Sequence, residues 1–208
     1  MAAFRESDTE RILALVEGHP FGQLITAPDG VPYVSHLPFL LDRGDWKLRL
    51  LGHMARANPQ WRHFESGREV LTVFNGPHAY VSPGWYASAD VQTWNYAVAH
   101  LRGVPRLVED AAELEALLNT MIRAHKSDTV ETWRTGLTQE RQAKLFEMIV
   151  GFEIGITELQ GKFKLRQNRP EEDRGQVAAA LLRSGDQIDA AVARLMTESG
   201  RTPRSAPD

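Results

Sequence analysis

The first apolar residues of the chain recur at helical intervals. Ser7 stands three residues before Glu10, which is a capping-box spacing, and Gly18 ends the pattern. Between them, one side of a helix would carry the apolar residues Ile12, Leu13, Leu15 and Val16. The pattern predicts a short helix over residues 8–17.

The pattern changes at Phe21 to one that is typical of strands. Apolar runs at 21–27, 31–41 and 46–52 are separated by two turn signals, Pro28-Asp29-Gly30 and Asp42-Arg43-Gly44-Asp45. Runs joined by such short turns predict an antiparallel meander. Asn58-Pro59 then favours a short helix over residues 59–64, because Asn caps a helix and Pro suits its first position.

The rest of the chain mixes strands and helices. We expect strands over 69–75, 78–82 and 96–108, with a break at Gly76-Pro77 and a loop over 83–93. We expect helices over about 110–122 and 138–148, joined by residues 125–137. Ile149–Glu158 and Lys162–Gln167 predict a hairpin that turns at Leu159-Gln160-Gly161, and residues after 171 read as a helical tail with a break near Ser184-Gly185.

These elements predict an α+β fold that is mainly antiparallel β. Several antiparallel strands in a chain of 208 residues favour a barrel, because closure removes exposed strand edges. The sequence shows no repeat and no clear linker. We therefore expect one domain over residues 1–208, with a C-terminal helical tail over about 171–199.

Composition narrows the classes of function. The net charge of −3 gives the whole chain no attraction for DNA, although a local basic patch stays possible. The sequence has no cysteine, which excludes disulfides, thiolate nucleophiles and Cys-ligated zinc. Its N-terminus lacks the pattern of a signal peptide, and no apolar stretch approaches the roughly 20 residues of a membrane span. We expect a cytoplasmic protein.

The densest polar cluster, at residues 52–61, is predicted where a strand ends and a short helix begins. A helix N-terminus suits an anion, Arg56 offers a fork of donors that matches phosphate, and His53 could add another donor. This interpretation is a phosphate site. The alternative is that Asn58 is only a cap, Arg56 is solvated and His53 is structural.

Large aromatic residues gather in the segment that follows. Trp85, Tyr86 and Trp94 fall in the predicted loop region, where surface is expected. Such rings suit a planar ligand or a subunit interface. The alternative is that they cap one end of the barrel.

Two other kinds of site receive less support. His36, His53, His78 and His100 fall on or beside strands, but no pair has the spacing of a His-x-His or His-Glu-x-x-His metal motif. The sequence also lacks a nucleophile elbow, a Walker A loop and a dinucleotide-binding glycine turn. We predict no metal site, and the residues themselves name no catalytic group beyond the two histidines His36 and His53.

A basic cluster lies near the end of the strands. Lys162, Lys164 and Arg166 would share one face of a strand while Phe163 and Leu165 face the core. The row of cations could contact a ligand phosphate or nucleic acid, or be simply solvated. No convincing helix-turn-helix accompanies it, because the helices over 110–148 carry many acidic residues.

These clusters, in this order, resemble the PaiB-type family of FMN-binding negative transcriptional regulators. The resemblance runs from about Phe21 to Leu182 and rests on several segments: Ser35-His36-Leu37-Pro38, GHMARANPQW at 52–61, FNGPHAYVSPGWY at 74–86, TWNY at 93–96, GFEIGIT at 151–157 and KFKLRQNRP at 162–170. It implies a homodimeric split β-barrel related to pyridoxamine-phosphate-oxidase-like flavoproteins, with FMN at the subunit interface.

The resemblance also assigns roles by position. Ser35, His36 and Leu37 would line the isoalloxazine ring. The segment His53, Met54, Ala55, Arg56 and Asn58 would hold the phosphate. Thr93 and Trp94 would come from the partner subunit, and Lys164 with Gln167 would close the site.

Two departures from the family pattern stand out. The chain begins Met1-Ala2-Ala3-Phe4 rather than with a Met-Tyr-x-Pro-type segment, and Arg166 replaces a common small Ser. Two functions follow as alternatives. The first is a regulator in which FMN is sensor or structural ligand, with direct DNA binding weakly supported. The second is an FMN-dependent oxidoreductase, and a haem-binding relative is a further possibility.

Overall fold

The computed structural model of the protein describes residues 4–44, 47–88, 90–125 and 138–201. Contacts group the chain into two compact units. Unit 1 comprises Met1–Leu15, Asn75–Ala99 and Gln160–Asp208, and unit 2 comprises Val16–Phe74 and His100–Leu159. The prediction of a single domain stays a prediction.

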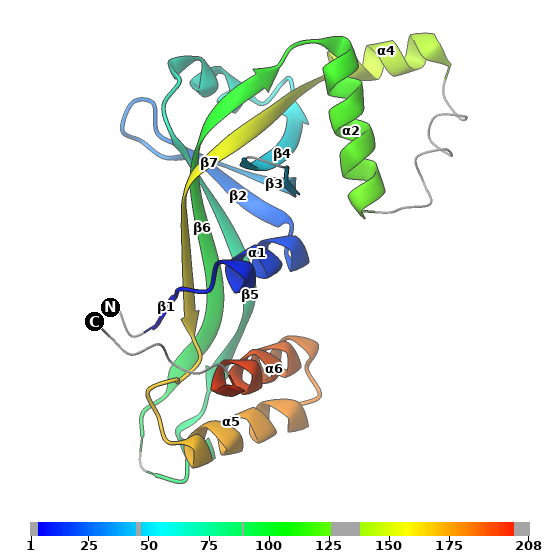
Figure 1. The fold of residues 1–208 in the computed structure, drawn as a ribbon. Coiled ribbons are helices and arrows are strands. Elements are labelled where there is room, and N and C mark those ends of the chain that lie inside the picture. Colours follow the sequence, from blue (N-terminus) through cyan, green and yellow to red (C-terminus); the bar gives the residue numbers. More distant parts are fainter. Residues whose placement is uncertain (1–3, 45–46, 89, 126–137, 202–208) are drawn as a thin grey trace. The chain divides into compact units, whose positions relative to one another are not determined.

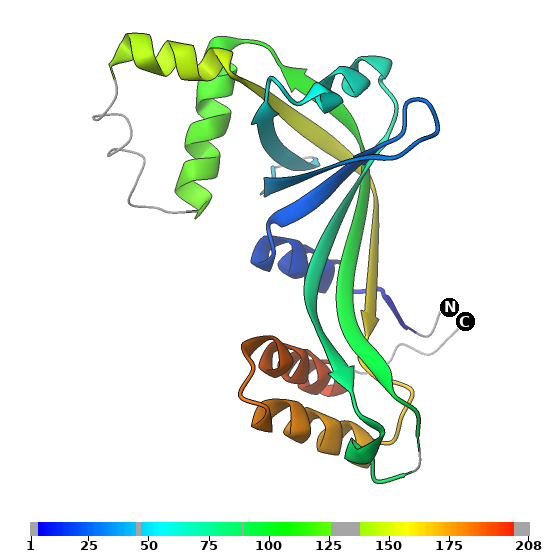
Figure 2. The same ribbon diagram turned by 180° about the vertical axis from the view of Figure 1, so that it is seen from behind.

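The described residues form a 7-stranded sheet, coloured by sequence in Figure 1 and seen from behind in Figure 2. The strands are β1 (Arg5–Glu6), β2 (Phe21–Thr26), β3 (Tyr33–Arg43), β4 (Leu48–Ala55), β5 (Val70–Val81), β6 (Thr93–Val108) and β7 (Ile149–Lys164). Their order is β1-β7-β4-β3-β2-β5-β6, and a further pairing of β7 with β6 closes it. Closure of a mainly antiparallel sheet confirms the predicted fold class.

The helices lie close to their predicted positions. They are α1 (Thr9–Gly18), α2 (Ala111–His125), α4 (Gln139–Glu147), α5 (Glu171–Arg183) and α6 (Gln187–Arg201), with short 3-10 helices η2 (Pro59–Ser66) and η3 (Pro83–Trp85). The predicted connection over 125–137 lies outside the described residues from 126 onward. The predicted break in the helical tail is confirmed between α5 and α6.

The core of unit 2 is aromatic. The ring of Phe39 lies 5.5 Å from that of Phe74 and 6.2 Å from that of Phe152, which in turn lies 5.3 Å from Phe64. A Cβ at Gly52 would come within 2.6 Å of the Phe152 ring, so glycine makes room for it. These rings fix which face of each strand points inward.

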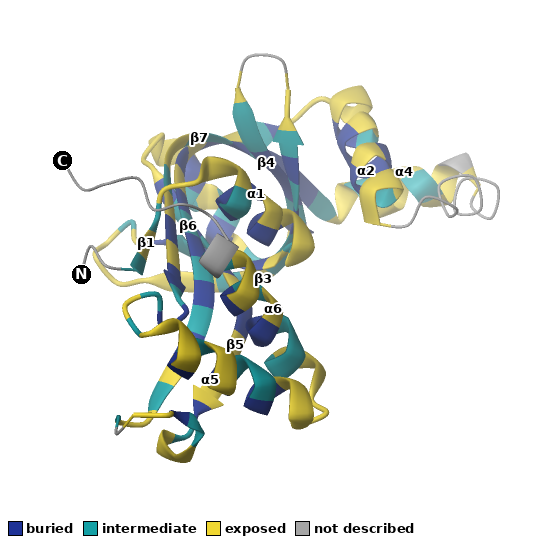
Figure 3. Ribbon diagram, turned by 60° about the horizontal axis from the view of Figure 1, so that its bottom comes forward, coloured by how far each residue is buried: buried dark blue, intermediate teal, exposed yellow. Residues whose placement is uncertain are grey.

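The opposite sheet face of unit 2 is partly covered by α2. Leu51 and Val108 of the strands form a buried cluster with Leu114, Leu117, Leu118 and Met121 of this helix, and Leu40 packs against it. Figure 3 shows the consequence, because buried positions follow one side of α2 and exposed positions the other. A helix with one apolar stripe needs such a partner surface.

In unit 1, α5 and α6 pack side by side, as Figures 1 and 2 show from opposite directions. Val177 and Leu181 of α5 and Val192 and Met196 of α6 are buried. The predicted inward positions Phe163 and Leu165 are also buried, with 1% and 0% of their surface exposed.

A predicted hairpin turn and a predicted strand break are wrong. β7 runs without a turn from Ile149 to Lys164, because Gly161 serves a close approach: a Cβ there would lie 2.6 Å from Ile12. β5 likewise continues through Gly76-Pro77, where the alternation of buried and exposed residues slips by one position. Both glycines are needed for close packing, but in the sequence they resemble turn residues.

Candidate functional site

The candidate residues on β3 point to two different faces. Phe39 and Leu41 are buried in the core, and side chains alternate along a strand, so Ser35 and Leu37 share the inward face. His36 points outward, where its exposed ring stacks on Phe21 at 6.4 Å and 26°. Of the three residues expected to line a flavin ring, only His36 presents its side chain on the outer face.

β4 continues this pattern further than predicted. The strand runs to Ala55, so the His53 to Ala55 segment lies within it rather than after its end. Met54 is 2% exposed and belongs to the core, whereas His53 shares its face with Leu51. Leu51 pairs with Leu40, four residues after His36, so His36 and His53 lie on the same outer face.

The imidazole of His53 carries an unsatisfied polar atom. Its Nδ1 is buried and has no hydrogen-bond partner among the residues that the structure describes. Burial lowers the pKa of His53, so the ring is neutral near pH 7. Because a buried polar atom without a partner costs free energy, a ligand or an ordered water that supplied a partner would stabilise this atom.

Arg56 is exposed, as the alternative interpretation held, but its guanidinium group is also engaged by the main chain. Its Nε donates to the carbonyl of Glu147 at 2.7 Å and its Nη2 to that of Ile149 at 2.9 Å. The side chain therefore fastens the junction between α4 and β7 to the turn after β4. The remaining Nη1 makes no hydrogen bond to the described residues, so a phosphate contact through it stays a prediction.

Asn58 is a cap, as the alternative interpretation held. Its Oδ1 accepts from the backbone N–H of Gln60 at 3.0 Å, and its Nδ2 donates to Oγ of Ser35 at 2.8 Å. Gln60, fully buried, donates in turn to the carbonyls of Leu24 and Tyr33. The sequence did not predict this structural role of Gln60, because the hydrophobic pattern does not distinguish a buried glutamine from an exposed one.

The other candidates lie together in unit 1. Lys164 Nζ donates to Thr93 Oγ1 at 2.6 Å. Trp94 is 52% exposed and lies on β6, not in the predicted loop, because this strand begins at Thr93. Gln167 accepts from the backbone N–H of Leu165 at 2.9 Å and donates to the carbonyl of Phe163, so both groups of its side-chain amide close the end of β7.

Arg166 does not extend the predicted row of cations. Its backbone is left-handed, with φ of 63°, which turns the side chain inward. There it forms a buried ion pair with Asp90 and contacts the hydroxyl of Tyr86, whose ring is buried. Arg169 also pairs with Asp90 at 2.7 Å. Arg166, which stands where the family commonly has Ser, thus has a carboxylate partner within this chain.

Asp173 fixes the same loop from α5. Its carboxylate accepts from the backbone N–H groups of Ala87 and Ser88 at 2.8 and 3.1 Å, and from the Ser88 hydroxyl at 2.7 Å. These bonds lower the pKa of Asp173. Asp173 therefore holds the aromatic-rich loop at Ala87 and Ser88, while Arg166 and Arg169 hold it at Asp90.

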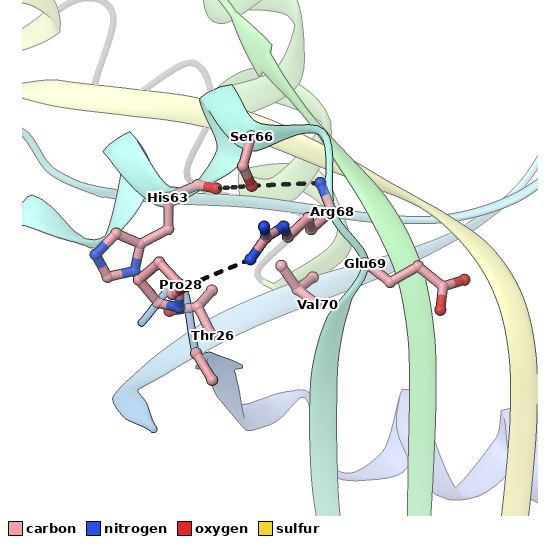
Figure 4. A pocket seen from close by; sticks show the side chains of 8 residues that line it. Thr26, Pro28, His63, Ser66, Arg68, Glu69 and Val70 are labelled. Atoms are coloured by element: carbon pink, nitrogen blue, oxygen red, sulfur yellow. Dashed lines mark hydrogen bonds between the residues drawn. The ribbon is translucent and has the colours of Figure 1, made fainter. Parts of the chain in front are cut away.

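A cavity of about 120 Å³ lies in unit 2. It is lined by Ala27 and by the residues that Figure 4 labels, which are Thr26, Pro28, His63, Ser66, Arg68, Glu69 and Val70. His63 Nδ1 and Thr26 Oγ1 lie 2.7 Å apart, and Arg68 donates to the carbonyl of Pro28 at 3.3 Å. No residue expected to bind flavin lines it.

Residues 4–44, 47–88, 90–125 and 138–201 provide neither a cluster of metal ligands nor a membrane-spanning helix. No group of three or more acidic, histidine or cysteine side chains there could hold a metal ion. No helix there is both long and apolar enough to cross a membrane.

Comparison with known proteins decides the family. Residues 1–158 match the family described as "Putative FMN-binding domain". The chain belongs to this family. Its relatives include the protease synthase and sporulation protein PAI 2 of Bacillus subtilis, 36% identical over 82% of each chain. An uncharacterized protein of Emericella nidulans is 31% identical over 96% of each.

Solved structures show the fold of this FMN-binding family member. The flavocytochrome Anf3 of Azotobacter vinelandii is 22% identical, with a TM-score of 0.63 over 84% of this chain and 75% of its own. The FAD and heme binding protein of Mycobacterium smegmatis is 18% identical, with a TM-score of 0.59 over 84% and 79%. The predicted resemblance, the split-barrel flavoprotein fold and FMN as the cofactor are confirmed.

Proposed function

We propose that the protein is a homodimer that uses bound FMN in gene regulation, as PaiB-type negative regulators do. The observation that carries the flavin site is the orphaned Nδ1 of His53, on an outer sheet face inside the segment that matches the FMN-binding family. His36 shares that face and stacks on Phe21, which offers a planar surface. The residues present therefore fit an aromatic, phosphorylated cofactor.

Each residue group would take one part of the cofactor. His36 would lie against the ring system, Arg56 Nη1 and the main chain of residues 53–55 would hold the phosphate, and His53 would gain its missing partner. The resemblance assigns Thr93 and Trp94 to the partner subunit, which is why we propose a dimer, and Lys164 with Gln167 would close the site. When bound, FMN supplies reversible one- and two-electron chemistry.

The regulatory part of the proposal is supported by the relative in Bacillus subtilis, whose name refers to protease synthesis and sporulation. The net charge of −3 argues against tight contact with DNA phosphates, so we propose an indirect influence on transcription. A gel-shift series in rising salt tests this part. Strong binding at low salt that weakens steeply with salt would replace the indirect model with direct DNA contact.

The flavin site has its own test. The purified protein should acquire a bound flavin spectrum on addition of FMN, and sedimentation should give twice the monomer mass. His53→Leu, which removes both ring nitrogens, should weaken FMN binding, while His63→Leu at the separate cavity should not. Equal FMN affinity in all three proteins would remove His53 from the site.

A second function is favoured by the same histidine. A neutral His53 on the flavin face could accept a proton, as an FMN-dependent oxidoreductase requires. Anaerobic mixing of the FMN-loaded protein with NADPH or NADH tests it through bleaching of the flavin. Persistent flavin colour with both donors would leave regulation as the proposed function.

A further inference from the structure

The outward sheet face of unit 1 combines aromatic rings with cations. On β6, Trp94 and Tyr96 alternate with buried residues, and on β7, Lys162 and Lys164 do the same. Tyr80 lies on the neighbouring β5 with 43% of its surface exposed. We name this surface the aromatic–cationic face, made of Arg5, Tyr80, Trp94, Tyr96, Lys162 and Lys164.

The rings form one continuous surface. Trp94 and Tyr80 meet edge to face with centroids 6.0 Å apart, and His78 adds a third ring 6.1 Å from Trp94. The hydroxyl of Tyr80 donates to Gln92 at 3.2 Å, which fixes its ring. Large exposed aromatics in fixed positions are typical of surfaces that stack a planar partner.

The cations border these rings. The Nζ atoms of Lys162 and Lys164 lie 5.6 and 6.0 Å from the Tyr96 ring centroid. Arg5 pairs in register with Lys162 across β1 and β7, so its side chain shares that face. Glu6 faces the other side, where it pairs with Arg11 at 2.7 Å.

No carboxylate offsets this charge on the described strand segments of unit 1. Exposed positions of β5, β6 and β7 there carry only aromatic, amide or basic polar side chains. The loop carboxylate of Asp90, between β5 and β6, is 4% exposed and engaged by Arg166 and Arg169. The face is thus complementary to a ligand that joins a planar ring to an anion.

We propose that the aromatic–cationic face binds a free nucleotide, with its base stacked on Trp94 and Tyr80 and its phosphate beside Lys162 and Arg5. Base stacking on aromatic side chains with neighbouring cations is the physical basis of such binding. A few cations in a chain of net charge −3 suit one or two phosphates rather than a polymer. This inference rests on the proposed function, because Thr93, Trp94 and Lys164 are also candidate FMN-binding residues. The nucleotide would therefore be the effector or co-substrate of the FMN site.

The test is calorimetric titration of the FMN-treated protein with adenosine 5′-monophosphate, and separately with adenosine and inorganic phosphate. We expect adenosine 5′-monophosphate to bind, and each fragment to bind more weakly. Lys162→Gln and Tyr80→Leu should weaken it about tenfold, the loss expected for a charged hydrogen bond or a stacked ring. Lys162→Arg, Tyr80→Phe and Lys144→Gln on α4 should keep the affinity.

Other outcomes would overturn the proposal. Failure of adenosine 5′-monophosphate to bind, or stronger binding of a thymidine oligonucleotide, would overturn it. Loss of bound FMN in Lys162→Gln would also overturn it. A changed oligomeric state of the variants would do the same, because it would mean that a second copy of the chain covers the face. FMN content is measured on every sample. Nucleotide binding without any FMN uptake would refute the proposed function and leave this inference standing.

Discussion

The amide nitrogen of Asn58 donates to the hydroxyl oxygen of Ser35 across 2.8 Å, which joins the turn before η2 to β3. The same amide, through its oxygen, caps η2 at Gln60. Two candidate flavin residues, selected for different roles, are thus parts of one structural connection. Any effect of either residue on FMN must be separated from an effect on stability.

Asn58→Ala should lower the free energy of unfolding by about 1–2 kcal/mol, because it removes both the cap and the link to Ser35. Ser35→Ala removes only the link and should cost about 0.5–1.5 kcal/mol. Urea unfolding of the FMN-free proteins measures both. If Ser35→Ala cost as much as Asn58→Ala, the cap would contribute nothing.

Arg56→Ala should weaken FMN binding by about 1.5–3 kcal/mol if Nη1 contacts the phosphate. It should also destabilise the junction of α4 and β7, since two carbonyls lose their donor. Arg56→Lys keeps a cation but cannot bridge both carbonyls. FMN titration and urea unfolding of the two variants separate the roles, because a purely structural Arg56 would give equal losses of FMN affinity in both.

The strands and helices of this chain could be predicted largely because their signals are local. Asn58-Pro59, for example, both caps and starts η2 as expected. The alternation of Phe163 and Leu165 with lysines gave the correct inward face of β7. Local pattern decides these features because capping and side-chain alternation involve only neighbouring residues.

Features that depend on distant partners could not be predicted. Gly161 resembles a turn residue until Ile12 is seen against it. Arg166 seemed to continue a row of cations, but its left-handed backbone and its distant partner Asp90 turn it inward. Ser35 and His36 were grouped in one role although strand alternation sends them to opposite faces.

Stability should fall in mild acid because of His53. Burial lowers the pKa of its folded state below the ordinary value of about 6.5, so the unfolded chain binds the proton more tightly. The loss begins as pH falls through that ordinary value and levels off below the folded pKa. Burial also lowers the pKa of His19, so this residue contributes a second part of the loss of stability.

The measurement is urea unfolding of the FMN-free protein between about pH 8 and pH 5, a range that brackets the ordinary histidine pKa. His53→Gln cannot titrate, so it should show a shallower decline than the unsubstituted protein, and His19→Gln should remove the other share. Parallel pH curves for His53→Gln and the unsubstituted protein would mean that the folded and unfolded pKa values of His53 are equal.

The buried pair of Arg166 and Asp90 should show strong coupling in a double-mutant cycle. Asp90→Asn leaves Arg166, 8% exposed, without its anion, and breaking such a pair typically costs about 3–5 kcal/mol. Arg166→Asn removes the cation while tolerating the left-handed backbone. The double variant should therefore be more stable than the sum of single losses implies, by at least about 1 kcal/mol.

The exposed pair of Arg102 and Glu158, at 3.3 Å, is the control and should couple by less than about 1 kcal/mol. Unfolding by urea gives all the terms, and additive losses at Arg166 and Asp90 would show that the pair does not hold the loop.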